Sequence, residues 1–146
     1  MLKKTPQNLS PELYTILYEM GHGDELVIVD ANFPARSNAA RYYANAAMDS
    51  VQMLDLITQY LPLDTFVPSP AFLMSVVPGD NYEPELWPKY KEILRQHEGG
   101  EVMLTYLDRE AFYAQSRKAY AIISTGERFR YGNIILKKGI VEPERK

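Results

Sequence analysis

The sequence predicts a single-domain, three-layer α/β/α fold with a largely parallel or mixed sheet. Two observations lead to this prediction. Segments with the apolar spacing of helices alternate along the whole chain with short apolar runs that are typical of buried strands. No internal repeat, linker or low-complexity tract divides the 146 residues, a length that suits one hydrophobic core. We therefore expect one domain over residues 1–146.

The first elements have recognisable start and stop signals. Ser10-Pro11-Glu12, followed by apolar residues at helical spacing, predicts a capped helix that ends at Gly21. The unbroken apolar run 26–29 ends at Asp30 and predicts a strand that is covered on both faces. The next elements expected are a helix over 46–60 and a strand over 72–77.

The second half of the chain continues the alternation. Pro88 is expected to open a helix that ends at Gly99-Gly100, because glycine commonly follows the last helical residue. Asp108 is in position to cap a further helix. The other elements expected are a strand over 102–107, a helix over 109–118, and strands over 120–124 and 131–136 joined by a turn at Thr125-Gly126-Glu127.

Composition excludes several kinds of chemistry. The chain has no cysteine, which excludes disulfides and thiolate nucleophiles and suits the cytoplasm. It contains no apolar segment of the length that a signal peptide or a membrane span needs. The net charge is −3 and the basic residues of the C-terminal part form no clustered run, so we expect no nucleic-acid partner. Phosphate loops and dinucleotide fingerprints are also absent, so we predict no cofactor.

His22 is the first candidate for proton transfer. It lies between Gly21 and Gly23, where little side-chain bulk shields it, and imidazole exchanges protons near neutral pH. The alternative is a loop histidine without a function. His97 lies at a predicted helix end, where interaction with the helix dipole is the simpler explanation. The two histidines therefore predict no metal site.

Two carboxylates are further candidates. Asp30 ends the first predicted strand, and ligands of layered α/β folds bind at the carboxyl ends of strands. Asp64 lies in the apolar stretch Leu61-Pro62-Leu63-Asp64-Thr65. For both residues the alternative is a structural one, in which the carboxylate caps a turn.

Hydrogen-bonding side chains suited to a neutral polyol occur near the C-terminus. Arg109 and Tyr113 are four residues apart on a predicted helix, so a guanidinium lies beside a phenol. An ordinary solvated helix face is the alternative. Tyr131 and Asn133 are two apart on a predicted strand, so they share one face. A phenol and an amide on one face can bracket hydroxyl groups.

These candidates fall in three blocks that resemble the RbsD/FucU sugar mutarotases, and within that family the L-fucose mutarotase branch. The blocks cover nearly the whole chain: Leu9-Ser10-Pro11-Glu12-Leu13 through Met20-Gly21-His22-Gly23-Asp24-Glu25 to Asp30-Ala31-Asn32-Phe33-Pro34-Ala35; Leu61-Pro62-Leu63-Asp64-Thr65-Phe66-Val67; and Arg109, Phe112-Tyr113, Lys118-Ala119, Thr125-Gly126-Glu127 and Tyr131-Gly132-Asn133-Ile134-Ile135-Leu136-Lys137-Lys138-Gly139.

The resemblance implies a function and a set of roles. It makes His22 the general acid that donates a proton during the interconversion of sugar anomers, without a cofactor. It assigns sugar binding to Asp30, Arg109 and the segment Tyr131-Gly132-Asn133. Animal fucose mutarotases also point to Asp64 and Tyr113, either of which could accept or relay the anomeric proton. The family further implies a ring-like homo-oligomer, a decamer.

Two features concern the choice of sugar. The family's ribose branch usually reads Asp-Ala-Gly-Leu-Pro where this chain has Asp30-Ala31-Asn32-Phe33-Pro34, which favours fucose. Ala44-Asn45-Ala46-Ala47 departs from the usual Arg-Ala-Asp-Gly of fucose mutarotases, so either the second helix starts differently or a contact is lost. A D-ribose pyranase and a non-catalytic sugar-binding accessory of transport are the alternative functions.

The spacing of His22 and Asp30 bears on assembly. His22 precedes the first predicted strand and Asp30 ends it, so an extended chain would separate the two by roughly 20 Å. Three explanations are open: the Gly21–Asp24 loop folds back over the strand, Asp30 is less extended than predicted, or the groups that serve one sugar come from two chains. We favour the last, with the 131–133 segment reaching a neighbour.

Overall fold

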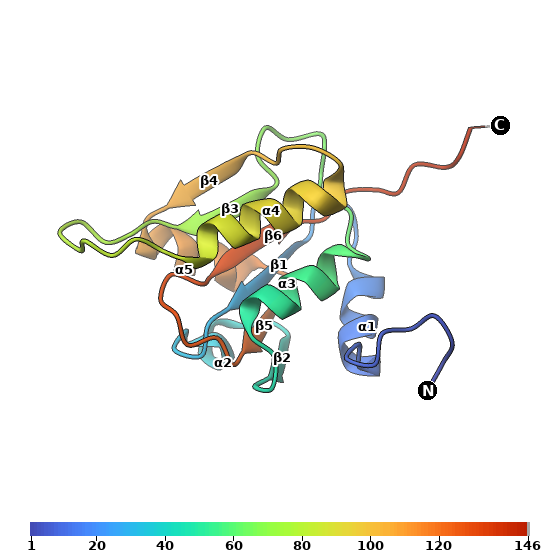
Figure 1. Cartoon of the computed structure of the whole chain (residues 1–146), viewed down its shortest axis with the longest axis horizontal. Helices are drawn as coiled ribbons and strands as arrows, with labels where there is room; N and C mark the ends of the chain where they lie inside the picture. The colour runs from blue at the N-terminus through green and yellow to red at the C-terminus, as the bar shows by residue number, and fades with distance from the viewer. Residues whose placement is uncertain (146) are drawn as a thin grey trace.

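One mixed sheet forms the centre of the structure, a computed structural model that describes residues 1–145 (Figure 1). Its six strands are β1 (Glu25–Val29), β2 (Tyr42–Asn45), β3 (Ala71–Met74), β4 (Leu104–Leu107), β5 (Ala121–Thr125) and β6 (Ile134–Lys137). They lie in the order β2-β5-β1-β6-β3-β4. β6 is antiparallel to its neighbours β1 and β3, and the other adjacent pairs are parallel. The prediction of a largely parallel or mixed sheet is confirmed.

Helices cover both faces of this sheet. They are α1 (Pro11–Glu19), α2 (Ala35–Asn38), α3 (Ser50–Thr58), α4 (Leu86–Glu98) and α5 (Arg109–Lys118). α1, α3 and α4 pack on one face, whereas α2 and α5 pack on the other (Figure 1). The predicted three-layer α/β/α arrangement is therefore confirmed.

β1 illustrates how the sequence produces these layers. Leu26 and Ile28 point into the core beneath α1, α3 and α4, while Val27 and Val29 point into the core beneath α2 and α5. All four side chains are fully buried. Burial of each contributes about 1.5–3 kcal/mol, and burial on both faces explains why the run 26–29 contains no polar residue.

The predicted helix boundaries rest on side-chain caps. The Ser10 hydroxyl accepts a hydrogen bond from the Leu13 N–H at 3.1 Å, and the Asp108 carboxylate accepts one from the Ala111 N–H at 2.8 Å. Both caps satisfy N–H groups that have no partner within their helix. Gly99 ends α4 with a left-handed φ of 77°, a conformation that glycine adopts without strain. α4 begins at Leu86, before the predicted Pro88.

The helix predicted over 46–60 is shorter, because α3 starts at Ser50. Asp49 and Gln52 form a capping box there, since each side chain accepts a hydrogen bond from the other residue's backbone N–H. Ala44-Asn45-Ala46-Ala47 therefore lies outside the helix, at the end of β2 and just after it. Sequence analysis missed β2 and α2, which are only four residues long each.

The segment predicted as a strand over 131–136 begins as a strand only at Ile134. Tyr131 has a left-handed φ of 59°, so Tyr131 and Asn133 do not share a strand face as predicted. The turn at 125–127 also does not join two adjacent strands, because β1 lies between β5 and β6. The strands predicted over 72–77 and 102–107 are shorter as well, as β3 and β4.

Gly126 generates a prediction for stability. A Cβ on this residue would lie 2.2 Å from the Ala46 carbonyl oxygen, so Gly126→Ala forces two backbone segments apart. We expect the free energy of unfolding to fall by about 3 kcal/mol in a urea titration, the upper range for an overpacked site. Gly100→Ala is the matched control, because an added Cβ there meets nothing within 4 Å. Equal stabilities of the two variants would contradict this account of Gly126.

Candidate active site

The His22 and Asp64 side chains meet where β1 begins. His22 Nε2 lies 3.0 Å from Asp64 Oδ1, although the residues are 42 positions apart in the sequence. Backbone hydrogen bonds to the end of β6 place both loops: the Gly23 N–H donates to the Lys138 carbonyl at 2.8 Å, and the Asp64 N–H donates to the Lys137 carbonyl at 3.0 Å. His22 is 44% exposed and Asp64 only 5%. This pair, with the neighbouring Phe66, is called the histidine cluster below.

The surroundings of Asp64 favour its ionised form. The Phe66 N–H and the His22 side chain both donate hydrogen bonds to the carboxylate and lower its pKa. When His22 Nε2 carries the proton bonded to Asp64, Nδ1 is the nitrogen that can exchange a proton with a ligand. The Phe66 ring lies 5.4 Å from the imidazole centroid, and a surface cavity of about 280 Å³ borders Asp64. The arrangement can orient an imidazole for acid–base chemistry.

A second group of polar side chains lies at the opposite end of β1. The Asn133 amide oxygen accepts a hydrogen bond from the Asp30 N–H at 2.9 Å, and Asp30 Oδ1 accepts one from the Asn32 N–H at 2.9 Å. Both side chains are buried. Burial raises the pKa of Asp30 and outweighs the N–H groups that face its carboxylate.

Tyr131 and Gly132 complete this second group. The Tyr131 hydroxyl donates to Asp80 Oδ2 at 2.8 Å. Gly132 has no room for a side chain, since an added Cβ would lie 2.9 Å from Leu86. Asp30, Tyr131, Gly132 and Asn133 are called the sugar cluster below, after the hydroxyl-binding role predicted for them.

Arg109 and Tyr113 lie together as their spacing predicts. The Arg109 guanidinium carbon is 5.4 Å from the centroid of the Tyr113 ring, so the two side chains form a cation–π contact. The Tyr113 ring packs edge-on against Phe33 at 5.0 Å, three residues after Asp30. Tyr113 therefore lies toward the end of β1 that bears the sugar cluster.

The two clusters do not meet within one chain. β1 spans five residues and β6 runs antiparallel to it, so Asn133 lies near the end of β1 and Lys137 pairs with Glu25 at its start. At about 3.3 Å per residue, the clusters are separated by roughly 20 Å. The loop that carries His22 bonds to the end of β6 and does not fold back over β1. Asp30 directly follows β1, so within one chain the two clusters lie at opposite ends of this strand.

Glu127, which was predicted only as part of a turn, links the residue after Asp30 to the start of α3 through hydrogen bonds. Its carboxylate is 3% exposed and accepts hydrogen bonds from the Ser50 N–H and hydroxyl, at 3.2 and 2.7 Å, and from the Arg128 and Phe129 N–H groups, at 2.9 and 3.0 Å. Burial alone would raise the pKa of Glu127, but these donors lower it overall. Its backbone carbonyl accepts from the Ala31 N–H at 2.9 Å.

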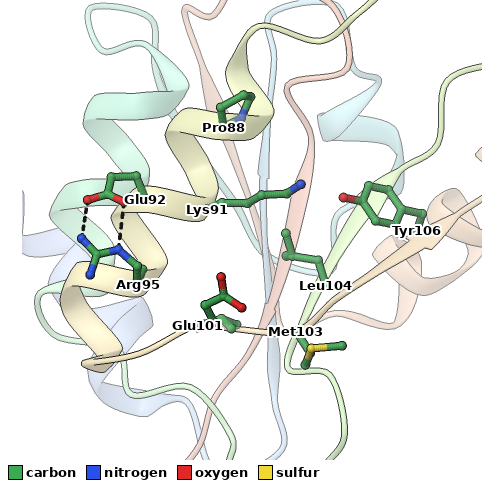
Figure 2. Close-up of a pocket in the computed structure, with 9 residues that line it drawn as sticks. Pro88, Lys91, Glu92, Arg95, Glu101, Met103, Leu104 and Tyr106 are labelled. Carbon is green, nitrogen blue, oxygen red and sulfur yellow. Dashed lines mark hydrogen bonds and ion pairs between the residues drawn. The ribbon is translucent and has the colours of Figure 1, made fainter.

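Another surface cavity is lined by no residue of either cluster. It measures about 480 Å³ and opens between α4 and the edge strand β4, where Lys91, Glu101 and Tyr106 face one another (Figure 2). Arg95 pairs with Glu92 on its helical side, at 2.6 Å (Figure 2). Within residues 1–145, its lining includes no residue that the sequence predicted for the site.

Residues 1–145 contain no group of three or more His, Cys, Asp or Glu side chains placed to hold a metal ion. No helix in the described part of the chain has the length and apolar character that crossing a membrane requires.

The fold and the two clusters define an α/β protein with an acid–base side-chain pair and a separate group of buried polar side chains. Comparison with known proteins gives the family. The chain belongs to the RbsD / FucU transport protein family, whose model matches residues 3–141.

Several relatives found by sequence comparison are fucose mutarotases. The chain is similar to fucose mutarotase of Bos taurus, with 43% identity over 99% of this chain and 97% of the relative. It is also similar to L-fucose mutarotase of Actinobacillus pleuropneumoniae (strain L20), with 39% identity over 96% and 97%.

Solved structures agree with these relatives. A fucose mutarotase from Streptococcus pneumoniae, in complex with L-fucose, matches with a TM-score of 0.91 and 45% identity over 97% of this chain and 100% of that one. Bacillus subtilis RbsD complexed with D-ribose matches with a TM-score of 0.72 and 22% identity over 97% and 100%, which shows a shared fold.

Glu127 generates a pH-dependent prediction. In Glu127→Gln the amide NH₂ must face backbone donors that cannot reorient, so we expect a loss of about 2 kcal/mol in unfolding free energy at pH 7. Because the folded-state pKa of Glu127 lies below its ordinary value of 4.5, the carboxylate stabilises the fold above that value. This contribution is lost as the pH falls through the lowered pKa, so the stabilities of wild type and variant converge in acid.

The control for this prediction is Glu83→Gln, which changes an exposed carboxylate. We expect it to leave unfolding within about 0.5 kcal/mol of wild type at every pH, as surface substitutions usually do. A constant gap between wild type and Glu127→Gln from neutral pH into acid would show that the charge of Glu127 is not what stabilises the fold.

Proposed function

We propose that the protein is an L-fucose mutarotase, a cofactor-independent isomerase that interconverts the α and β anomers of the free sugar. The observation that carries the proposal is the contact between His22 and Asp64, 3.0 Å apart, on a chain that is similar over nearly its whole length to several fucose mutarotases. An imidazole held by an ionised carboxylate is the acid–base group that ring opening needs.

The reaction requires only proton movements. One proton is delivered to the ring oxygen of the pyranose while the anomeric hydroxyl loses another, and the ring opens to the aldehyde. Rotation about the adjacent carbon–carbon bond and reclosure then give either anomer. General acid–base catalysis supplies about 10² to 10⁴ in rate, which suffices for a step without a covalent intermediate.

The proposed roles follow the two clusters. His22 donates the proton to the ring oxygen, and Asp64 holds the imidazole through Nε2. Asp30, Arg109 and the segment 131–133 bind the sugar hydroxyls. Asp64 already accepts hydrogen bonds from His22 and Phe66, so Tyr113, at the other cluster, is the better placed of the two to accept or relay the anomeric proton.

One site is then built from two chains of a ring-like homo-oligomer, with the histidine cluster of one copy beside the sugar cluster of the next. The length of β1 supports this, because a monosaccharide is smaller than the gap between the clusters within one chain. Exposed apolar side chains near His22 also support it. Phe66 is 68% exposed, and Tyr18 and Val141, which border a cavity with Lys138, are 77% and 80% exposed.

Two other functions use the same residues. A D-ribose pyranase would interconvert pyranose and furanose rings, and a sugar-binding accessory of transport would bind without proton transfer. Saturation-transfer NMR on equilibrated fucose, ribose and galactose separates all three, because only a catalyst transfers saturation between ring forms. The absence of cysteine supports a cytoplasmic location for the proposed enzyme.

We expect His22→Gln to abolish most anomer exchange of L-fucose while the fold stays intact. The side chain is 44% exposed, so its replacement removes little buried surface. Loss of a general acid lowers the rate by about 10² or more. Saturation-transfer NMR measures the exchange, and an unchanged thermal unfolding midpoint is the control. Exchange at the wild-type rate would remove His22 from the mechanism.

Complementation between inactive chains tests the shared site. His22→Ala and Asn133→Ala are each expected to be inactive, but hybrid oligomers formed by unfolding and refolding the mixture contain sites with both wild-type residues. We expect activity to return in that mixture. The matched control mixes His22→Ala with His22→Gln, which leaves every site without the histidine. A mixture of the first two that stays inactive, or a fully active monomer in sedimentation, would place the whole site in one chain.

A further inference from the structure

Tyr131 is held at its phenol by the segment between β3 and α4, and at its backbone by the first turn of α4. Its hydroxyl donates to Asp80 Oδ2 at 2.8 Å and accepts from the Val77 N–H at 3.1 Å. Its carbonyl oxygen accepts a hydrogen bond from the Trp87 indole N–H at 3.0 Å. The Tyr82 ring lies 5.8 Å from the Tyr131 ring. Sequence analysis singled out none of these four partners.

These contacts hold the Tyr131 backbone in a conformation that a non-glycine residue disfavours. A left-handed φ of 59° is unfavourable for a bulky side chain, and such a conformation persists where surrounding contacts determine it. In this conformation the phenol oxygen reaches both the Val77 N–H and the Asp80 carboxylate. These hydrogen bonds therefore fix the orientation of the strained residue.

Asp80 is itself well anchored as a hydrogen-bond acceptor. Its Oδ1 accepts from the Tyr82 N–H at 3.1 Å, and Arg130 approaches Oδ2 at 3.3 Å. The Tyr131 phenol is the main cause of a lowered pKa of Asp80, and the Tyr82 N–H and Arg130 add to it. At neutral pH the carboxylate is thus ionised, and an ionised carboxylate can only accept hydrogen bonds.

We propose that Asp80 is a positioning residue, which accepts the hydrogen bond donated by the Tyr131 phenol so that the Tyr131 oxygen meets the sugar as a hydrogen-bond acceptor. This inference rests on the proposed function, in which Tyr131 binds the sugar. Because the phenol proton is directed to Asp80, the Tyr131 oxygen can only accept a hydrogen bond from any further group. A ligand group that meets it must then donate, as a hydroxyl of a free sugar can.

A double-mutant cycle tests whether Asp80 acts through Tyr131. The variants are Asp80→Ala, Tyr131→Phe and the pair together, and the readouts are kcat and KM for L-fucose anomer exchange. We expect Asp80→Ala to raise KM about fivefold, the loss typical of one hydrogen bond, with a smaller change in kcat. In the Tyr131→Phe background the same substitution should change KM less than twofold, because the phenol is no longer there to be positioned.

Glu83→Ala is the matched control, since it removes an exposed carboxylate from the same segment and should leave both constants unchanged. Thermal unfolding of each variant verifies the fold. An equal loss from Asp80→Ala in both backgrounds, or no loss in either, would overturn the role of Asp80. Failure of wild-type protein to exchange fucose anomers would overturn the proposed function instead, so the two failures are distinguishable.

Discussion

The fixed length of β1 is the constraint on which the proposed mechanism depends. This strand is paired on both edges, with β5 and β6, and packed on both faces, so it can neither bend nor slip without opening two cores. It holds the proposed proton donor at one end and the proposed sugar-binding side chains at the other. In the proposed oligomer, a second copy brings the two clusters together, and activity would then depend on assembly.

The polar side chains at the two ends of β1 differ in their exposure to solvent. At the histidine end a buried carboxylate holds an exposed imidazole, which stays accessible to a ligand. At the sugar end the polar groups are buried and mutually bonded. The Asp30 N–H bonds to Asn133, the Ala31 N–H bonds to the Glu127 carbonyl, and the Glu127 carboxylate bonds to the start of α3. Such a network is rigid before a ligand arrives, which lowers the entropy lost on binding.

Features that depend on residues close together in the sequence could be predicted, whereas features that depend on distant residues could not. The buried strand 26–29 and the capped helix starts at Ser10 and Asp108 depend on neighbouring residues, and local patterns predict them well. The contact between His22 and Asp64 bridges 42 residues, and only the fold creates it. The left-handed Tyr131 was missed because the apolar residues after it continue a strand pattern, while the contacts that reshape it come from Val77, Asp80 and Trp87. The sequence around Tyr131 carries no pattern that indicates contacts with such distant residues.

The electrostatics of the sugar cluster bear on the kind of sugar that binds. Asp30 has a raised pKa because it is buried, and the neighbouring negative charge of Glu127 raises it further. A second anion brought to this place would meet two carboxylates in a poorly solvated environment, where repulsion between like charges is strong. Hydroxyl groups, in contrast, can donate to Asp30 and to the Asp80-oriented phenol of Tyr131. At the proposed site, the charge distribution therefore favours an uncharged sugar over a phosphorylated one.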